Sequence, residues 1–281
     1  MMTNETTGQV FSEKACPEHT AVLVVSFGTS YPETRKNTID RIEEDIRTSY
    51  PQYPFYRAWT SRFVVAKLKK RDGVHIMDVR EAMEKMREDG IRRVIVQPTY
   101  VLAAIECDYM KQEVEACREW FDSVVISNTL IVTQEDKEEI VKCMAEEYHP
   151  AEDEILLLMG HGTEHTANAL YEELNKLFKD MGYTNIFMGT VEGDFSLENF
   201  LGTLKERKPS RVLLAPFMIV AGDHACNDMA GDEPDSWKSI LAREGFAVSC
   251  SIRGLGELPA ARKIFVRHMK EAEKNLLSDF S

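Results

Sequence analysis

The chain has 281 residues, of which 43% are hydrophobic and 29% are charged, and its formal net charge at pH 7 is −13. This length suits one large domain or two domains of ordinary size, and the composition is that of a globular protein. The negative charge and the lack of a long Lys/Arg run exclude broad nucleic-acid binding, and no apolar run approaches the roughly 20 residues of a membrane helix.

The N-terminal residues 1–20 contain no basic segment followed by an apolar core, so they do not form a signal peptide. We therefore expect a loosely ordered lead-in and a cytoplasmic protein. The six cysteines are scattered without CxxC spacing. Free thiols in a reducing compartment follow from that spacing.

Short apolar runs alternate with helical patterns in the first half. The apolar runs predict strands at 21–27, 55–59, 94–96 and 124–126. A stripe of isoleucines at helical spacing predicts the first helix, around residues 39–46. Similar patterns predict further helices at 63–71, 79–88, 108–120 and 135–148. Residues 100–106 are expected to form a loop, and the His149-Pro150 pair marks a boundary between the halves.

The second half repeats this alternation. Strands are predicted at 155–159, 186–188, 212–215 and 247–250. Helices are predicted at 166–179, 195–206, 230–243 and 259–277. Such alternation indicates βαβ units, so we expect an α/β protein of two similar domains, 21–150 and 151–281, each a parallel sheet flanked by helices with a cleft between them.

The two halves also resemble each other residue by residue. The matching pairs of segments are 24–30 with 158–164, 58–63 with 188–193, and 93–108 with 211–226. This alignment places Phe27 opposite His161, Arg62 opposite Glu192, and Glu106 opposite His224. A repeat of this length favours an internal duplication, although any two βαβ stretches share some pattern.

Three polar residues of the second half, His161, Glu192 and His224, each follow one of its first three strands. The carboxyl ends of parallel strands share one edge, which is where open α/β sheets bind ligands. Two imidazoles and a carboxylate suit a first-row divalent metal with open positions, whereas singly each could be an ordinary polar turn residue. Glu106 would approach from the other half, where a carboxylate could accept protons.

Several motifs carry a resemblance to a known family. They are VVSFGTSYPETRKNTI, QPTYVLAAIECDYMKQEV, GHGTEHTAN, GTVEG and GDHACNDMAGDEPDSW. With these motifs the sequence resembles the anaerobic cobalt chelatases, the sirohydrochlorin cobaltochelatases of the class II chelatase group. The resemblance implies insertion of Co²⁺ into the tetrapyrrole sirohydrochlorin on the anaerobic cobalamin route. It also implies that His161, Glu192 and His224 bind the metal, with His161 as the expected proton acceptor. One nitrogen cannot hold the metal and a proton together, so either the two roles of His161 are sequential or the proton goes to a water or to Glu106.

The implied substrate carries many carboxylates while the protein is acidic, so basic residues should line the cleft. Arg57, Arg62, Arg35 and Lys36 lie at or after first-half strand ends, and we expect Arg57 or Arg62 to bind substrate. Cobalt enters as a substrate metal, with Fe²⁺ or Ni²⁺ as alternatives in vitro.

One alternative function is the insertion of iron into the same macrocycle for siroheme. Two further interpretations also stay open. They are a non-catalytic tetrapyrrole or metal carrier of similar fold, and a metal-dependent hydrolase that uses the same His/Glu/His set. The expected partner is a small molecule, with no nucleic acid or membrane, and a homo-oligomer is left open.

Overall fold

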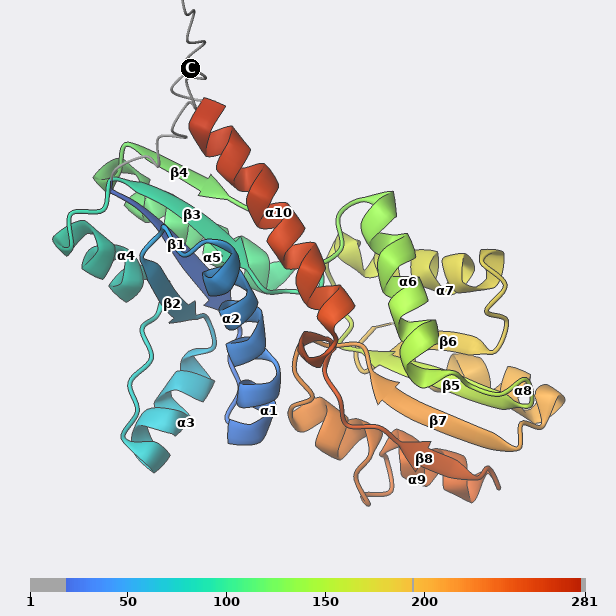
Figure 1. The fold of residues 1–281 in the computed structure, drawn as a ribbon. Helices are drawn as coiled ribbons and strands as arrows, with labels where there is room; N and C mark the ends of the chain where they lie inside the picture. Colours follow the sequence, from blue (N-terminus) through green and yellow to red (C-terminus); the bar gives the residue numbers. More distant parts are fainter. Residues whose placement is uncertain (1–18, 194, 279–281) are drawn as a thin grey trace, which may run out of the picture.

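The computed structural model describes residues 19–193 and 195–278, so nearly all of the predicted lead-in, residues 1–20, lies outside the described part. Two four-stranded sheets lie side by side, with strand orders β2-β1-β3-β4 and β6-β5-β7-β8 (Figure 1). Every strand pair is parallel. The predicted α/β class with a parallel sheet in each half is confirmed, and the shared strand order is what a duplicated unit gives.

The strands lie close to their predicted positions. Those of the first sheet are β1 (Thr20–Ser26), β2 (Phe55–Trp59), β3 (Arg93–Pro98) and β4 (Ser123–Ile126). Those of the second are β5 (Glu154–Gly160), β6 (Ile186–Thr190), β7 (Arg211–Pro216) and β8 (Val248–Cys250). The first-half helices are α1 (Pro32–Asn37), α2 (Ile39–Ser49), α3 (Arg62–Asp72), α4 (Val79–Glu88), α5 (Ile105–Cys117) and α6 (Gln134–Tyr148). The second-half helices are α7 (Ala169–Asp180), α8 (Glu198–Arg207), α9 (Trp237–Arg243) and α10 (Pro259–Ser278).

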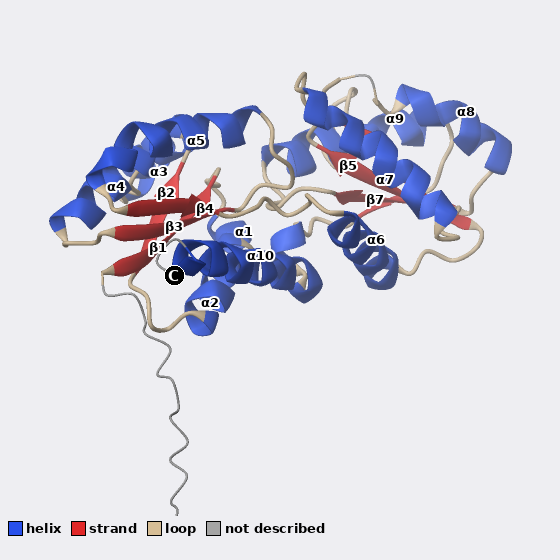
Figure 2. Cartoon of the chain, turned by 90° about the horizontal axis from the view of Figure 1, so that it is seen from above, coloured by secondary structure: helices blue, strands red, loops and turns tan. Residues whose placement is uncertain are grey.

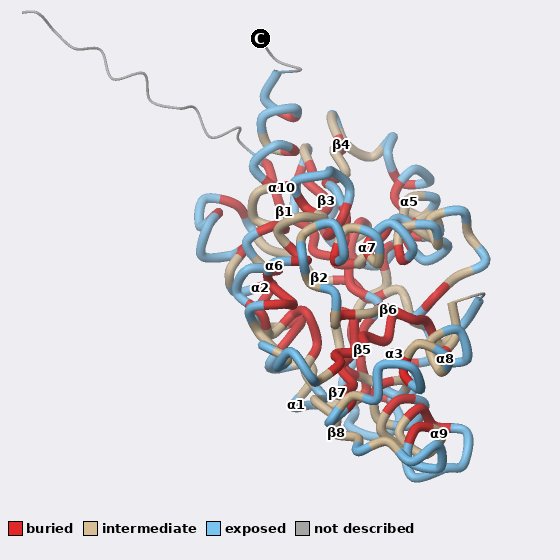
Figure 3. Tube along the Cα trace, turned by 90° about the vertical axis from the view of Figure 1, so that its right-hand side faces the viewer, coloured by how far each residue is buried: buried red, intermediate tan, exposed pale blue. Residues whose placement is uncertain are grey.

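Helices cover both faces of each sheet, which explains the unbroken apolar runs. In β1, Leu23 and Val25 pack with residues of α4 and α5 on one face. The alternate residues Val22 and Val24 pack on the other face in a core shared with α2, α6 and α10. All of β1 is buried, as the red strands in Figure 3 show. A strand buried on both faces loses the polar/apolar alternation that a half-exposed strand has.

The last helix of each half packs against the other half. The strands of the first sheet all precede residue 150 and those of the second all follow it, and α6 ends at His149 in a left-handed conformation. However, α6 contacts α7, and α10 lies over β3, β4 and α2 (Figures 1 and 2). Arg262 of α10 pairs with Asp45 of α2 at 2.6 Å. The exchanged helices therefore tie the two sheets into one shared core. Across the described residues, no helix is both long and apolar enough to cross a bilayer.

Several helix starts differ from the prediction by three residues or more, and two of the differences concern candidate site residues. Helix α5 begins at Ile105 instead of residue 108, because Ala104 caps it without a side-chain hydrogen bond and so leaves no cap signal in the sequence. A π-helix, His224–Met229, occupies part of the predicted loop, and α9 starts only at Trp237. Glu106 and His224 therefore lie in the first turns of helices and not on loops.

Candidate functional site

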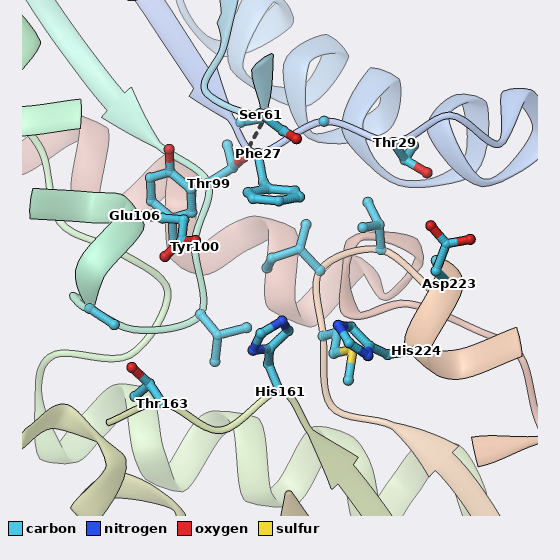
Figure 4. Close-up of a pocket in the computed structure, with 18 of the residues that line it drawn as sticks. Phe27, Thr29, Ser61, Thr99, Tyr100, Glu106, His161, Thr163, Asp223 and His224 are labelled. Carbon is cyan, nitrogen blue, oxygen red and sulfur yellow. Dashed lines mark hydrogen bonds between the residues drawn. The ribbon is translucent and has the colours of Figure 1, made fainter. Parts of the chain in front are cut away.

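A cavity of about 700 Å³ opens between the carboxyl ends of the two sheets and is lined by both halves. The second half contributes His161, Glu192 and His224 to its wall. The first half contributes Glu106 and Phe27, which Figure 4 shows on the side opposite the histidines. The strand ends thus bring all four predicted metal-binding or proton-accepting residues to one cavity.

The turn that holds His161 depends on close backbone packing. The backbone N–H of Glu192 donates to the carbonyl oxygen of His161 at 2.9 Å, which joins the loops after β5 and β6. Gly162 lies between them with φ of +81°, and a Cβ there would lie 1.9 Å from the Glu192 carbonyl oxygen. Only glycine fits both conditions, so Gly162 brings His161 and Glu192 together.

The two histidine rings meet edge to face, with centroids 4.6 Å apart and planes at 89°. The His161 Nδ1 lies 3.0 Å from the Gly162 carbonyl oxygen, and the His224 Nδ1 lies 2.7 Å from Oδ2 of Asp228. Both partners are hydrogen-bond acceptors, so Nδ1 is the donor in each contact, and the neutral form of each ring then has its lone pair on Nε2. The pair is therefore set to bind a metal ion through Nε2.

The carboxylates are less closely assembled than the rings. Glu192 and Glu106 are both exposed on the cavity wall. Among the described residues, no three His, Cys, Asp or Glu side chains converge as a closed metal cage. The arrangement suits an ion that is held loosely by two imidazoles, beside exposed carboxylates, and then passed on.

The predicted basic residues lie in different places. Arg57 is not on the cavity wall, because its guanidinium pairs with Asp40 at 2.7 Å and with the buried Glu43. Burial raises the pKa of Glu43, while Arg57 opposes that shift. Arg35 likewise pairs with Asp40, at 3.3 Å. Arg57 and Arg35 are therefore already engaged by carboxylates of the protein itself.

Two other basic residues of the first half are exposed. Arg62 is exposed at the first position of α3, between Ser61 and Phe63, which both line the cavity. Lys36 is exposed in the last turn of α1. Arg62 forms no salt bridge with any other described residue, which leaves its guanidinium open to a ligand.

The alignment of the halves needs a correction of one residue. In the first half, the N–H group of Ser61 donates to the carbonyl oxygen of Phe27, just after β1. In the second half, the N–H group of Glu192 donates in the same way to the carbonyl oxygen of His161, just after β5. The structural equivalent of Glu192 is therefore Ser61 and not Arg62. The pairings of Phe27 with His161 and of Pro98 with Pro216 agree with the strand registers.

The comparisons with known proteins agree with this geometry. Residues 20–274 match the family model described as cobalt chelatase (CbiK). This chain belongs to the CbiK cobalt chelatase family. It is 33% identical over 253 residues to the sirohydrochlorin cobaltochelatase of Salmonella typhimurium, covering 90% of this chain and 96% of that protein. It is 30% identical over 260 residues to the sirohydrochlorin cobaltochelatase CbiKC of Nitratidesulfovibrio vulgaris, covering 89% of each.

Solved structures share the fold of this cobalt chelatase family member. SirB from Bacillus subtilis with Fe³⁺ matches with a TM-score of 0.66 at 13% identity, over 93% of this chain and 98% of SirB. CbiX, titled as the terminal enzyme for biosynthesis of siroheme in denitrifying bacteria, matches with a TM-score of 0.51 at 14% identity, over 90% and 99%. At these identities the match establishes the two-sheet fold alone.

Two polar residues beside the paired histidines of this cobalt chelatase gain roles that sequence reasoning missed. Asp228 holds the His224 ring, and its spacing four residues after a histidine was a usable signal. Tyr31 lines the cavity from the first half and donates its hydroxyl to Asp223 at 2.5 Å. That hydrogen bond, with burial, raises the pKa of Tyr31 to about 12. Nothing in the sequence around Tyr31 indicates a partner so far along the chain.

Proposed function

We propose that this protein inserts Co²⁺ into sirohydrochlorin, with His161 and His224 as the metal-binding pair, Glu192 as a further ligand, and Glu106 as a proton acceptor. The observation that carries the proposal is the imidazole pair, with both Nε2 atoms available, opposite an apolar wall in a cavity between two sheets. The names of the two curated relatives supply the substrate.

The chemistry of metal insertion matches these groups. A tetrapyrrole must lose two pyrrole protons, and a divalent ion must lose water, before the ion enters the ring. Two imidazoles hold Co²⁺ less tightly than they hold Ni²⁺ or Cu²⁺, which favours its release to the macrocycle. A histidine nitrogen that binds the ion cannot take a proton at the same time. Glu106 faces the cavity without another described hydrogen-bond or salt-bridge partner and can take that role.

The apolar wall offers a surface for a flat macrocycle. Phe27 is 44% exposed and lies across the cavity from His161 (Figure 4), and Phe63 is 72% exposed. Exposed aromatic rings on a cavity wall offer apolar surface, and a flat conjugated ring system that lies against them buries that surface. A macrocycle that lies against Phe27 would present its pyrrole nitrogens to the histidine pair.

The test is the absorbance change of sirohydrochlorin mixed with Co²⁺ and a catalytic amount of protein, against the rate without protein. We expect many turnovers per protein molecule, and Fe²⁺ and Ni²⁺ should be compared in parallel. Product in a single stoichiometric amount would instead indicate a carrier. If the protein bound no sirohydrochlorin and hydrolysed a small acidic substrate with zinc, the proposal would be wrong.

Glu106→Gln should lower kcat for cobalt insertion at least about 100-fold, because positioned proton acceptors contribute about 10²–10⁴-fold. Glutamine keeps the shape but removes the basic carboxylate. The affinity for Co²⁺ should stay the same, since Glu106 lies outside the proposed ligand set. Glu113→Gln on the same helix, α5, lies off the cavity wall and is the matched control. A variant within twofold of wild type would reduce Glu106 to a wall residue, and loss of Co²⁺ binding would make it a ligand.

Arg62→Glu should raise KM for sirohydrochlorin several-fold, and more at low salt, where charges about 10 Å or further apart are less screened. The described cavity wall carries no lysine or arginine but includes Glu106, Glu192 and Asp223, so a polycarboxylate needs a cation at the rim. Arg41→Glu makes the same charge change at an exposed position of α2 that does not line the cavity, and it should leave KM nearly unaltered. Equal effects of the two variants would show that only net charge matters.

A further inference from the structure

One hydrogen bond crosses the cavity from the first half to the segment that carries His224. The Tyr31 hydroxyl donates to Oδ1 of Asp223 at 2.5 Å, between residues 192 positions apart in the chain. Tyr31 lies between β1 and α1 and caps the start of α1. Asp223 immediately precedes His224 and caps the π-helix that begins there. Figure 4 shows Asp223 and His224 side by side on the cavity wall.

The same segment has few other side-chain links to the first half. Thr34 Oγ1 reaches the carbonyl oxygen of Ala221 at 3.5 Å, which is the limit of a hydrogen bond. Asp228 orients the ring of His224, but it lies on the same π-helix and moves with it. The segment also packs on the first half through Val220, which lies against the cluster that contains Ile39 and Trp59. The bond from Tyr31 is the short polar contact that joins the start of the π-helix itself to the first half.

A phenol bonded to a carboxylate forms a short, charge-assisted hydrogen bond of the strong kind. It holds Asp223 from the half that does not carry the histidines. His161 is anchored differently, through the backbone bond of its loop to Glu192 within the second half. The π-helix of His224 packs in the core of the second half through Ala225 and Met229, and Tyr31 adds an anchor from the first half. Both anchors bear on the distance of 4.6 Å between the two rings.

We propose that Tyr31 is a positioning residue that sets His224 against His161 from across the cavity, through its hydrogen bond to Asp223. The role rests on the proposed function, in which His224 binds the metal. Tyr31 does not contact the ion in this role but acts through Asp223.

The first experiment titrates Co²⁺ into wild-type and Tyr31→Phe protein without macrocycle and follows the ligand-field absorption of bound cobalt. We expect the Kd for Co²⁺ to rise about tenfold in the variant. This is the low end of the range of about 10–100-fold found when a direct outer-shell partner of a metal ligand is lost, because Tyr31 acts one step further away, through Asp223. In turnover assays KM for Co²⁺ should rise more than KM for sirohydrochlorin. An unchanged Kd for Co²⁺ would overturn the proposal.

A double-mutant cycle separates positioning from a general loss of stability. Asp223→Ala should weaken Co²⁺ binding as Tyr31→Phe does, and the double variant should be no weaker than either single one. Asp223→Asn keeps an acceptor oxygen and should recover part of the affinity. Independent effects that multiply in the double variant would contradict the proposal.

A matched control breaks a tyrosine–aspartate bond of the same chemistry elsewhere. Tyr56 donates to Oδ2 of Asp89 at 2.8 Å, and neither residue lines the cavity. Tyr56→Phe should therefore bind Co²⁺ as wild type does, and a loss equal to that of Tyr31→Phe would count against a specific role. Because the titration uses cobalt alone, it stays decisive even if wild type fails to metallate sirohydrochlorin, a result that would sink only the proposed function.

Discussion

Replacing His224 with alanine should abolish cobalt insertion while the protein stays folded. The side chain is 36% exposed at the cavity wall, so its removal leaves no cavity in the core. Loss of an outer-shell partner typically costs about 10–100-fold in metal affinity or activity, so loss of the ligand itself should exceed about 100-fold in kcat/KM. Circular dichroism and the melting temperature should match those of wild type.

The control and the partner variant make this result specific to the site. His75 is exposed and pairs with Glu81 at 3.2 Å away from the cavity, so His75→Ala should keep full activity. His161→Ala should be as inactive as His224→Ala, and the double variant no worse, because either loss breaks the same two-ring grip on one ion. Turnover near the wild-type rate in His224→Ala would remove this residue from the proposed ligands.

Most of the sheet architecture could be predicted because each buried strand leaves a local signal. Residues 155–159 form an unbroken apolar run, which predicts a buried strand, and β5 is buried along nearly its whole length. The exchange of α6 and α10 leaves no such signal. An amphipathic helix shows which of its faces is buried, but not which of two similar sheets covers that face. The pairing depends on contacts such as that of Arg262 with Asp45, between positions far apart in the chain.

The candidate site was predictable where a residue directly follows a strand and not where its direction depends on packing. His161 directly follows β5 and Glu192 is the second residue after β6, so the sheet itself carries them to the cavity. Arg57 lies inside β2, and which helix covers its face could not be read from the strand. The carboxylates of α2 cover it, and they bind Arg57 away from the cavity. Tyr31 was missed for the converse reason, since its partner is Asp223 in the other half.

A second large effect is expected at Gly162, which bears no functional group. Gly162→Ala would place a methyl group 1.9 Å from the Glu192 carbonyl oxygen at a φ of +81°. That carbonyl oxygen cannot easily retreat, because it accepts the Thr190 hydroxyl at 2.7 Å and Thr190 is fully buried. The loops of His161 and Glu192 must therefore separate, which displaces two proposed ligands at once.

Gly182→Ala is a close control, because Gly182 has a φ of +89° but nothing within 4 Å of an added Cβ. Both variants carry the cost of an L-residue in the left-handed region, about 1–2 kcal/mol. Only in Gly162→Ala does the added methyl group also clash with the Glu192 carbonyl oxygen, so this variant should melt at the lower temperature. It should also lose at least about 100-fold in cobalt insertion, as expected when ligands leave their places by an ångström or more. Gly182→Ala should lose stability while it keeps its activity. If the two variants insert cobalt at equal rates, the tight turn around Gly162 is not what brings His161 and Glu192 into working position.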